Sequence, residues 1–141
     1  ARFAEIMRLR TLLEPMVAAE AQPFIDAERL RLIRAADEAT DEALQSGDVS
    51  TYMEANFRFH ALIYAAAPMP LAGRMIEGLW MQFGPFMRVV YGRYGTASMA
   101  DQHKAATRAI ACGDAAALRD AIAADIGDCR DLMKDWEKLG I

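Results

Sequence analysis

Two short stretches with the same pattern, SGD at 46–48 and CGD at 112–114, divide this chain into helical segments. A glycine after a helical run ends the helix in a left-handed conformation, and an aspartate directly after it caps the next helix. Apolar residues recur at helical spacing between these points, and Ala, Leu, Met, Glu and Arg dominate where strand-forming residues are scarce. The sequence therefore predicts an all-α fold.

Helical spacing and these stop signals together predict six helices. We expect them over about residues 3–21, 23–45, 49–67, 70–94, 98–112 and 114–138. Pro15 predicts a kink in the first helix, and Gly84 with Pro85 predicts a bend in the fourth. Because short connections reverse the chain between neighbouring helices, the expected architecture is an antiparallel bundle.

The fourth expected helix differs from the others because apolar side chains surround it almost completely. They are Leu79, Trp80, Met81, Phe83, Phe86, Met87, Val89 and Val90. A helix of this kind is covered on every side, either as the central helix or with one face against a ligand cavity or a second subunit. Because six helices can cover only part of this surface, we expect a homodimer.

Length, charge and cysteine content exclude several classes of protein. The 141 residues suffice for one domain with a sizeable core. A net charge of −4 without clusters of Lys and Arg is unfavourable for binding nucleic acid through its phosphates. The longest weakly polar run, residues 61–73, contains Pro68 and Pro70 and is too short to span a membrane. Cys112 and Cys129 form no CxxC pair and no signal peptide is visible, so we expect free thiols in the cytoplasm.

Polar residues interrupt four of the apolar stripes at positions that face the interior. The stripes are Ile6, Arg10, Leu13 and Val17 in the first helix, Tyr52, Asn56, His60, Ile63 and Ala67 in the third, Met99, His103, Ala106 and Ile110 in the fifth, and Leu118, Ile122, Asp125, Cys129, Leu132 and Trp136 in the sixth. Residues spaced in this way share one face of a helix. The pattern therefore predicts that the polar members meet in a common interior. They are Asn56, His60, His103 and Asp125, with Arg10 joining from the first helix.

Two interpretations of this interior cluster remain open on the residues alone. A buried carboxylate needs a cation or a set of donors, because an isolated ion in a low dielectric is costly. Two imidazoles, one carboxylate and one amide oxygen suit a divalent metal such as zinc, nickel or manganese. The alternative is a hydrogen-bonded cluster, in which Asp125 accepts from His103 or Arg10 and His60 bonds Asn56.

Four segments of the chain carry a resemblance to a known family. They are RTLLEPMVAAEA (10–21), NFRFHALIYAAA (56–67), DQHKAATRAIACGD (101–114) and AIAADI (121–126). In this order they resemble the effector-binding C-terminal domain, called FCD, of the FadR branch of GntR-superfamily transcription regulators. The resemblance covers essentially the whole chain. It implies a helical bundle that dimerises, binds a small organic acid and follows a winged-helix DNA-binding domain. We therefore expect residues 1–141 to be an effector-binding and dimerisation domain, which reaches DNA only through a winged-helix domain absent from this chain.

The resemblance also implies roles for single residues. Many members of this family hold a metal through one Asp and three His residues, and His60 and His103 match two of those histidines. Asn56 stands at the position of the family's aspartate, and Asp125 stands at the position of its final histidine. These two departures nearly compensate, since one carboxylate and two imidazoles remain, and on balance we expect a bound divalent metal. Arg10 corresponds to the arginine of the family's RxxLE motif, which places it near the pocket.

Three functions fit these features. The first is a sensor, in which a small carboxylate enters a central cavity of the bundle and changes how two subunits are arranged. For that carboxylate we expect Arg10 and Arg88, since a guanidinium holds a carboxylate through two hydrogen bonds. The second is a metal-dependent enzyme using the same cluster, and the third is a purely structural dimerisation module. Because the chain has no nucleophile elbow, HExxH motif or phosphate loop, we expect a sensor that is not an enzyme.

Overall fold

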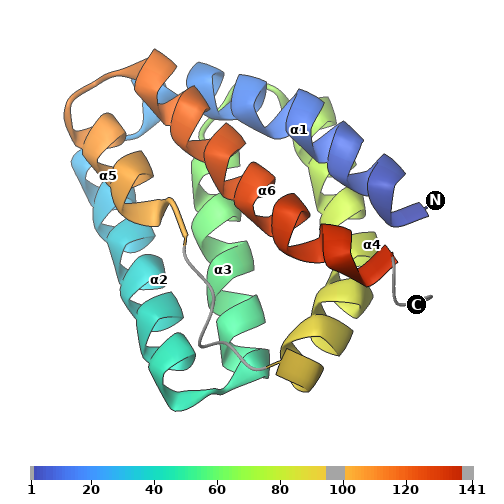
Figure 1. The fold of residues 1–141 in the computed structure, drawn as a ribbon. Helices are drawn as coiled ribbons and strands as arrows, with labels where there is room; N and C mark the ends of the chain where they lie inside the picture. The colour runs from blue at the N-terminus through green and yellow to red at the C-terminus, as the bar shows by residue number, and fades with distance from the viewer. Residues whose placement is uncertain (1, 95–100, 138–141) are drawn as a thin grey trace.

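The helices of the predicted bundle are present in the computed structural model, which describes residues 2–94 and 101–137, with side chains for 2–92 and 101–132. Over these residues the elements are α1 (Arg2–Ala21), a 3₁₀ turn η1 (Gln22–Phe24), α2 (Ala27–Ser46), α3 (Val49–Tyr64), α4 (Pro70–Tyr94), α5 (His103–Ala111) and α6 (Ala115–Glu137) (Figure 1). The predicted all-α fold with six helices is confirmed.

The two stop signals act as the sequence predicts. Gly47 and Gly113 have φ angles of 73° and 69°, in the left-handed region that a glycine adopts without steric cost. Asp48 caps α3 by accepting a hydrogen bond from the Thr51 amide at 3.1 Å. Asp114 caps α6 in the same way, at 3.0 Å from the Ala117 amide. These stops and caps fix where two of the connections reverse the chain, between α2 and α3 and between α5 and α6.

The observed ends of three helices differ from the predicted ones. α2 begins at Ala27 because Asp26 caps it, accepting from the Arg29 amide at 2.7 Å. α3 ends at Tyr64 rather than at residue 67. α5 begins at His103, where side chains hold the preceding backbone: Asp101 accepts from the His103 amide, and the Gln102 amide donates to Asp125 at 3.0 Å. Met99, predicted on the same stripe as His103, lies outside the described residues, as does the side chain of Trp136. α1 and α4 remain helical across Pro15 and Pro85.

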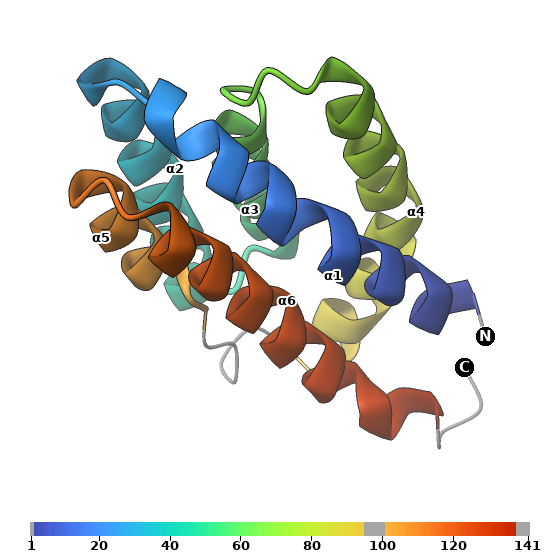
Figure 2. The same ribbon diagram turned by 90° about the horizontal axis from the view of Figure 1, so that it is seen from above.

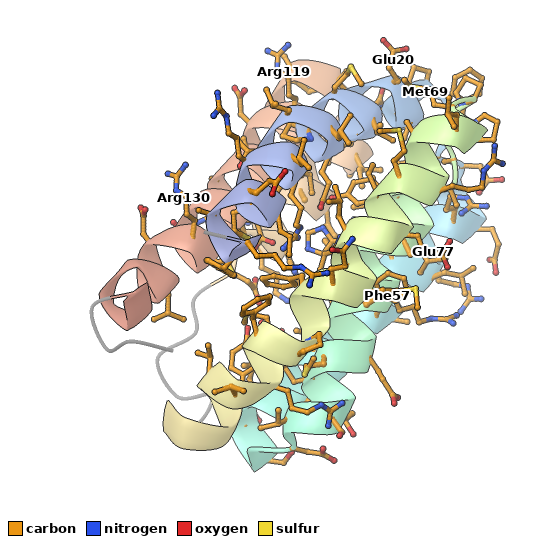
Figure 3. The ribbon with its side chains drawn as sticks, turned by 90° about the vertical axis from the view of Figure 1, so that its right-hand side faces the viewer. Glu20, Phe57, Met69, Glu77, Arg119 and Arg130 are labelled. Carbon is orange, nitrogen blue, oxygen red and sulfur yellow. The ribbon has the colours of Figure 1, made fainter. Side chains whose placement is uncertain are left out.

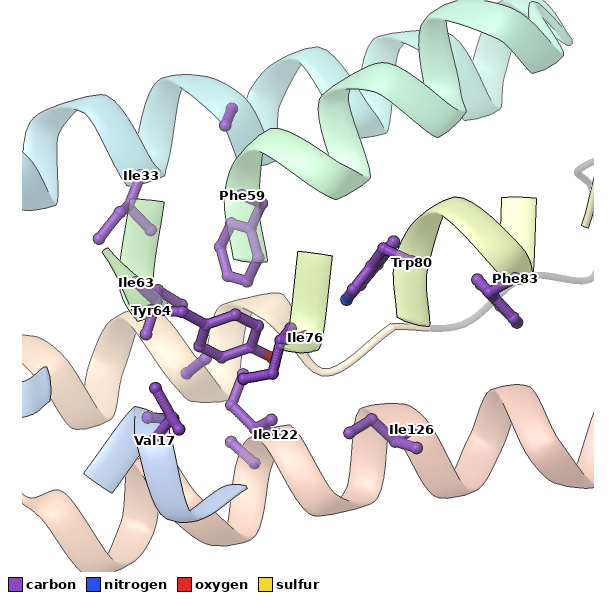
Figure 4. Close-up of a cluster of buried hydrophobic side chains, with 14 of the residues drawn as sticks. Val17, Ile33, Phe59, Ile63, Tyr64, Ile76, Trp80, Phe83, Ile122 and Ile126 are labelled. Atoms are coloured by element: carbon purple, nitrogen blue, oxygen red, sulfur yellow. The ribbon is translucent and has the colours of Figure 1, made fainter. Parts of the chain in front are cut away.

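The helices surround a core that continues along the inner faces of α1, α3, α4 and α6. α1 and α6 lie side by side and run in opposite directions, so that the start of α1 and the end of α6 lie at the same end of the molecule (Figures 1 and 2). α2 packs against α3, and α5 packs against α6 and α2. Among the fully buried side chains, Phe59, Ile63, Val17 and Ile122 meet at the centre (Figure 4).

α4 is not the central helix of the bundle. It buries Ile76, Trp80 and Phe83 against α1 and α3, and its other side is open in the single chain. Met81 is 75% exposed and Leu71 is 64% exposed. The apolar surface all round α4 therefore points to the other predicted alternative, in which part of the helix meets a cavity or a second subunit. Among the described residues, no helix combines the length and the apolar character that a membrane crossing requires.

Candidate functional site

Three of the four predicted cluster residues come together between α3, α5 and α6. His60 lies in the fourth turn of α3, His103 opens α5, and Asp125 lies in the middle of α6. One ligand atom from each lies within 4.8 Å of the others, and His60 Nε2 is 3.0 Å from Asp125 Oδ2. Both histidine side chains are 1% exposed, and that of Asp125 is 15% exposed. The inward stripes read from the sequence thus converge on one buried point.

The remaining predicted site residues lie elsewhere. Asn56 is half-buried, one turn before His60, and lines the cavity described below together with Arg10 and Asp125. Arg88 is exposed, donates to Ser50 Oγ at 3.4 Å and is not among the residues that line the cavity.

The hydrogen bonds of His60 assign its tautomer. Tyr64 Oη lies 2.6 Å from Glu14 Oε2 and 3.0 Å from His60 Nδ1. Burial, followed by the charge of Glu14, raises the pKa of Tyr64 well above its usual value, so the phenol remains protonated. Its O–H therefore donates the hydrogen bond to the carboxylate of Glu14. The Tyr64 oxygen must then accept the proton on His60 Nδ1. In a neutral imidazole this leaves a lone pair on Nε2.

His103 is held in a comparable way from α2. Its Nδ1 lies 3.0 Å from Asp37 Oδ1, while the other oxygen of Asp37 accepts from the ammonium of Lys104. Lys104 also donates to Asp41 at 2.7 Å. Asp101 Oδ2 is 3.8 Å from His103 Nδ1, which is too long for a hydrogen bond. Because an ionised carboxylate can only accept, the proton of a neutral His103 lies on Nδ1.

Both Nε2 atoms are left without a hydrogen-bond partner among the described residues, although each is buried. A lone pair on His60 Nε2 only 3.0 Å from a carboxylate oxygen places two acceptors in contact, which is unfavourable unless a cation lies between them. A buried set of two imidazole nitrogens and one carboxylate is the donor chemistry of a divalent metal site. The residues therefore fit a metal.

A proton is the competitor of a metal at this point. Burial lowers the pKa of His103, but the hydrogen bond with Asp37 and the charges of Asp125, Asp101 and Asp37 outweigh it, and the net pKa is raised. Burial raises the pKa of Asp125, yet the two histidines hold it well below its usual value. The predicted hydrogen-bonded alternative has other pairings in the structure. Asp125 meets His60 and the Gln102 amide, and His60 meets Tyr64.

Arg10 is buried on the inner face of α1 but is already paired. Its Nε and Nη2 lie 2.6 Å and 3.4 Å from the two carboxylate oxygens of Glu14. Its guanidinium carbon lies 4.2 Å from the ring centre of Trp80 and 4.4 Å from that of Phe83. Glu14 also accepts from Trp80 Nε1 at 3.1 Å. The carboxylate of Glu14 thus joins α1, α3 and α4 at one buried point.

Asp37 and Tyr64 are functional candidates that sequence reasoning missed. Asp37 follows Ile33 by four residues and shares its buried face, so the spacing along α2 contained the signal. Tyr64 likewise follows His60 by four residues. Their partners are distant in sequence, and periodicity along one helix does not identify such partners.

A cavity of about 410 Å³ lies beside the cluster, between α1, α3, α4 and α6. Aromatic and sulfur-containing side chains form most of its wall, among them Phe57, Trp80, Phe83, Met53, Met87 and Cys129. Asp125 belongs to this wall as well as to the cluster, so occupants of the cluster and of the cavity would be neighbours. Met81 and Asp128 line the cavity and are exposed, so the cavity reaches the surface. Its size suits a small molecule.

Comparison with known proteins gives one family and several regulators. A model of the FCD domain family matches residues 5–128. The HTH-type transcriptional regulator McbR of Escherichia coli (strain K12) is 32% identical over 87 residues, which are 62% of this chain and 39% of that protein. The matched segment thus covers well under half of that relative's length.

Two solved structures share the fold. The structure of E. coli McbR/YncC superimposes with a TM-score of 0.84 at 25% identity, over 94% of this chain and 68% of that one. A GntR family member from Pseudomonas syringae pv. tomato str. DC3000 gives a TM-score of 0.83 at 19% identity, over 97% of this chain and 57% of that one. At that identity the second likeness concerns the fold alone.

Proposed function

This chain belongs to the FCD family as the FCD domain of a GntR-family transcription regulator, and we propose that it senses a small carboxylate through a bound divalent metal. The observation that carries the proposal is the pair of buried Nε2 atoms without partners, beside Asp125 and next to a cavity. Residues 1–141 would then form the effector-binding and dimerisation domain. DNA would be bound by a winged-helix domain outside this chain, in the cytoplasm.

The proposed ligands of the metal are His60 and His103 through Nε2 and Asp125 through Oδ2, with Asn56 as a weaker oxygen ligand. Zinc, nickel and manganese suit this set. A bound ion would supply positive charge and open coordination positions for the carboxylate of an effector. Asp125 connects these positions to the cavity, because it lines both.

Arg10 can contribute only part of its guanidinium to effector binding, because it is already paired with Glu14. Its charge is matched by Glu14, and its Nη1 makes only a long contact of 3.9 Å with Met7 Sδ among the described residues. The Nη1 group is therefore the part of Arg10 that remains to donate to an effector carboxylate. Arg88 does not enter the proposal, because it is exposed and lies apart from the cavity wall.

A homodimer is also proposed, on the distribution of exposed apolar side chains. Seven large ones lie on α1 and α4, namely Leu9, Leu12, Met16, Leu71, Met75, Met81 and Val89. Seen from the side, α1 and α4 form the near surface of the molecule (Figure 3). Exposed apolar side chains gathered on two neighbouring helices are typical of an interface. We assign no enzymatic role, because the curated relative is a transcription regulator.

Metal analysis tests the central proposal. Protein purified without chelators or a nickel column should contain about one equivalent of metal per chain, and adding zinc, nickel or manganese to chelator-treated protein should raise its melting temperature. His60→Ala and His103→Ala should abolish the rise. Glu28→Gln, an exposed substitution on α2, is the control and should keep it. Clearly substoichiometric metal together with an unchanged melting temperature would contradict the proposal.

A further inference from the structure

We propose that Glu14 and Asp37 are positioning residues that fix the tautomers of His60 and His103, so that both Nε2 lone pairs face the metal. The inference rests on the proposed metal function. It adds that two carboxylates, which touch neither the ion nor the effector, set how tightly the two imidazoles bind a cation.

The first chain of hydrogen bonds runs from α1 to α3. Glu14 is 0% exposed and Tyr64 is 5% exposed, so water does not compete for their bond. Tyr64 uses its O–H for the 2.6 Å hydrogen bond to Glu14 Oε2. The tyrosine oxygen can then only accept in the 3.0 Å contact with His60 Nδ1, which requires an N–H on that nitrogen of the imidazole. The direction of the whole chain therefore follows from Glu14 acting as an acceptor, as the carboxylate paired with Arg10.

The second chain runs from α2 to α5 and obeys the same logic. Asp37 is 3% exposed and uses one oxygen for Lys104 and the other for His103 Nδ1. Lys104 has no acceptor capacity, so it orients Asp37 without reversing the proton on His103. Two histidines on different helices are thus set to the same tautomer by two independent carboxylates.

This arrangement has a measurable consequence for metal affinity. A histidine binds a metal only through an unprotonated nitrogen, and partners of the other nitrogen fix which one that is. Loss of such a partner typically lowers metal affinity 10–100-fold. A change that reverses a chain should reach at least this range, because it places a proton on the nitrogen that would bind the ion.

Amide substitutions are expected to reverse each chain with little change of shape. In Glu14, Oε1 accepts from Arg10 Nε at 2.6 Å and Trp80 Nε1 at 3.1 Å, while Oε2 accepts from Tyr64 at 2.6 Å and only at 3.4 Å from Arg10 Nη2. Glu14→Gln should keep its oxygen on the first side and turn its amino group towards Tyr64. Tyr64 then donates to His60 Nδ1, and the imidazole proton moves to Nε2.

Asp37→Asn should act on His103 in the same way. Its oxygen stays on Lys104, which can only donate, and its amino group faces His103 Nδ1. Asp41→Asn is the matched control, because Asp41 bonds the same lysine on the exposed side of the network. Glu28→Gln is the matched control for Glu14→Gln.

The test combines two readouts on the whole chain. Long-range ¹⁵N–¹H NMR of metal-free protein at pH 8 reports which nitrogen of each histidine is protonated, and competition with a chromophoric chelator measures zinc affinity. We expect Nδ1–H at both histidines in the wild-type protein. We expect Nε2–H at His60 in Glu14→Gln and at His103 in Asp37→Asn, with zinc affinity 10–100-fold lower in each. Both controls should match the wild-type protein.

Each result decides the inference. If Glu14→Gln and Asp37→Asn retain Nδ1–H at both histidines, or bind zinc within twofold of the wild-type protein, the inference is wrong. If Glu14→Gln does not fold, Tyr64→Phe takes its place. A Tyr64→Phe protein with the wild-type tautomer at His60 and the wild-type zinc affinity would also contradict the inference. A wild-type protein that binds no zinc, but whose tautomers reverse as described, would reject the proposed metal while supporting the positioning of the histidines.

Discussion

The charges that line the cavity lead us to expect that the proposed effector binding depends on the proposed metal. Arg10 is neutralised by Glu14, and the other charged residues in the cavity wall are Asp101, Asp125, Asp128 and Asp131. An incoming carboxylate would therefore meet like charge. A divalent ion held by His60, His103 and Asp125 changes the local sign, since its two positive charges exceed the one negative charge of its carboxylate ligand.

This balance predicts that organic acids bind only the metal-loaded protein. In a thermal-shift screen, small carboxylates should raise the melting temperature after zinc or manganese is added and should have no effect after treatment with a chelator. Matched neutral amides should have no effect in either state. Stabilisation by neutral compounds alone would contradict an anionic effector.

The two cysteines should differ in their reactivity towards alkylating reagents. Cys112 is exposed, whereas Cys129 is partly buried and lines the cavity. Burial raises the pKa of the Cys129 thiol to about 12, against a smaller opposing effect of Arg10. At pH 8 only about one Cys129 side chain in 10,000 would be a thiolate, the form that reacts. Mass spectrometry after brief treatment with iodoacetamide should find Cys112 modified and Cys129 intact. Equal rates at both positions would contradict the buried placement of Cys129.

At the scale of the elements, the helix ends owe their position to very few residues. Gly47 ends α2 with a φ angle of 73°, and a Cβ atom placed there would meet nothing within 4 Å. The cost of a side chain at Gly47 is therefore a backbone cost alone. Gly78, inside α4, has equally open surroundings and lies within a regular helix, where glycine is the unfavourable choice.

Alanine at these two glycines should therefore have opposite effects. Gly47→Ala should lower the free energy of unfolding by about 1–2 kcal/mol, because the left-handed conformation is strained for an L-residue. Gly78→Ala should raise it by about 0.5–1 kcal/mol through helix propensity. Urea denaturation followed by circular dichroism measures both. A loss of stability at both positions would indicate that packing rather than backbone conformation decides their cost.

The same elements show what could be predicted from sequence. Apolar periodicity and two glycine stops were enough to predict the helices. The stripes of α3, α5 and α6 were enough to predict that His60, His103 and Asp125 face the interior. No stripe could place Arg88, because a helix that is apolar all round has no stripe to mark its buried face, and the structure leaves this side chain exposed. The stripes also missed Asp37 and the role of Tyr64, since a hydrogen bond across 50 or 66 residues leaves no local pattern.

At the scale of the whole molecule, α1 links the proposed site to the proposed interface. Its inner face carries Arg10 and Glu14, which bond into the cluster through Tyr64, and its outer face exposes Leu12 and Met16. A change in the cluster could thus reach the surface through one helix, without passing through a loop. Whether α1 and α4 form the interface decides whether this route leads to a second subunit.

The interface assignment predicts that charge on α1 or α4 separates the subunits. Leu12 and Leu71 are each 64% exposed, so a glutamate at either position disturbs no core. In a dimer that buries both side chains, Leu12→Glu or Leu71→Glu would place an unpaired carboxylate in an apolar contact, which is strongly unfavourable. Light scattering after size exclusion should therefore give a dimer mass for the wild-type protein and a monomer mass for either variant. Phe24→Glu is the matched control, since Phe24 is 57% exposed and lies on η1, outside α1 and α4, and it should leave the dimer intact. A monomer mass for the wild-type protein across micromolar concentrations, or a dimer that survives both substitutions, would show that this surface serves another purpose.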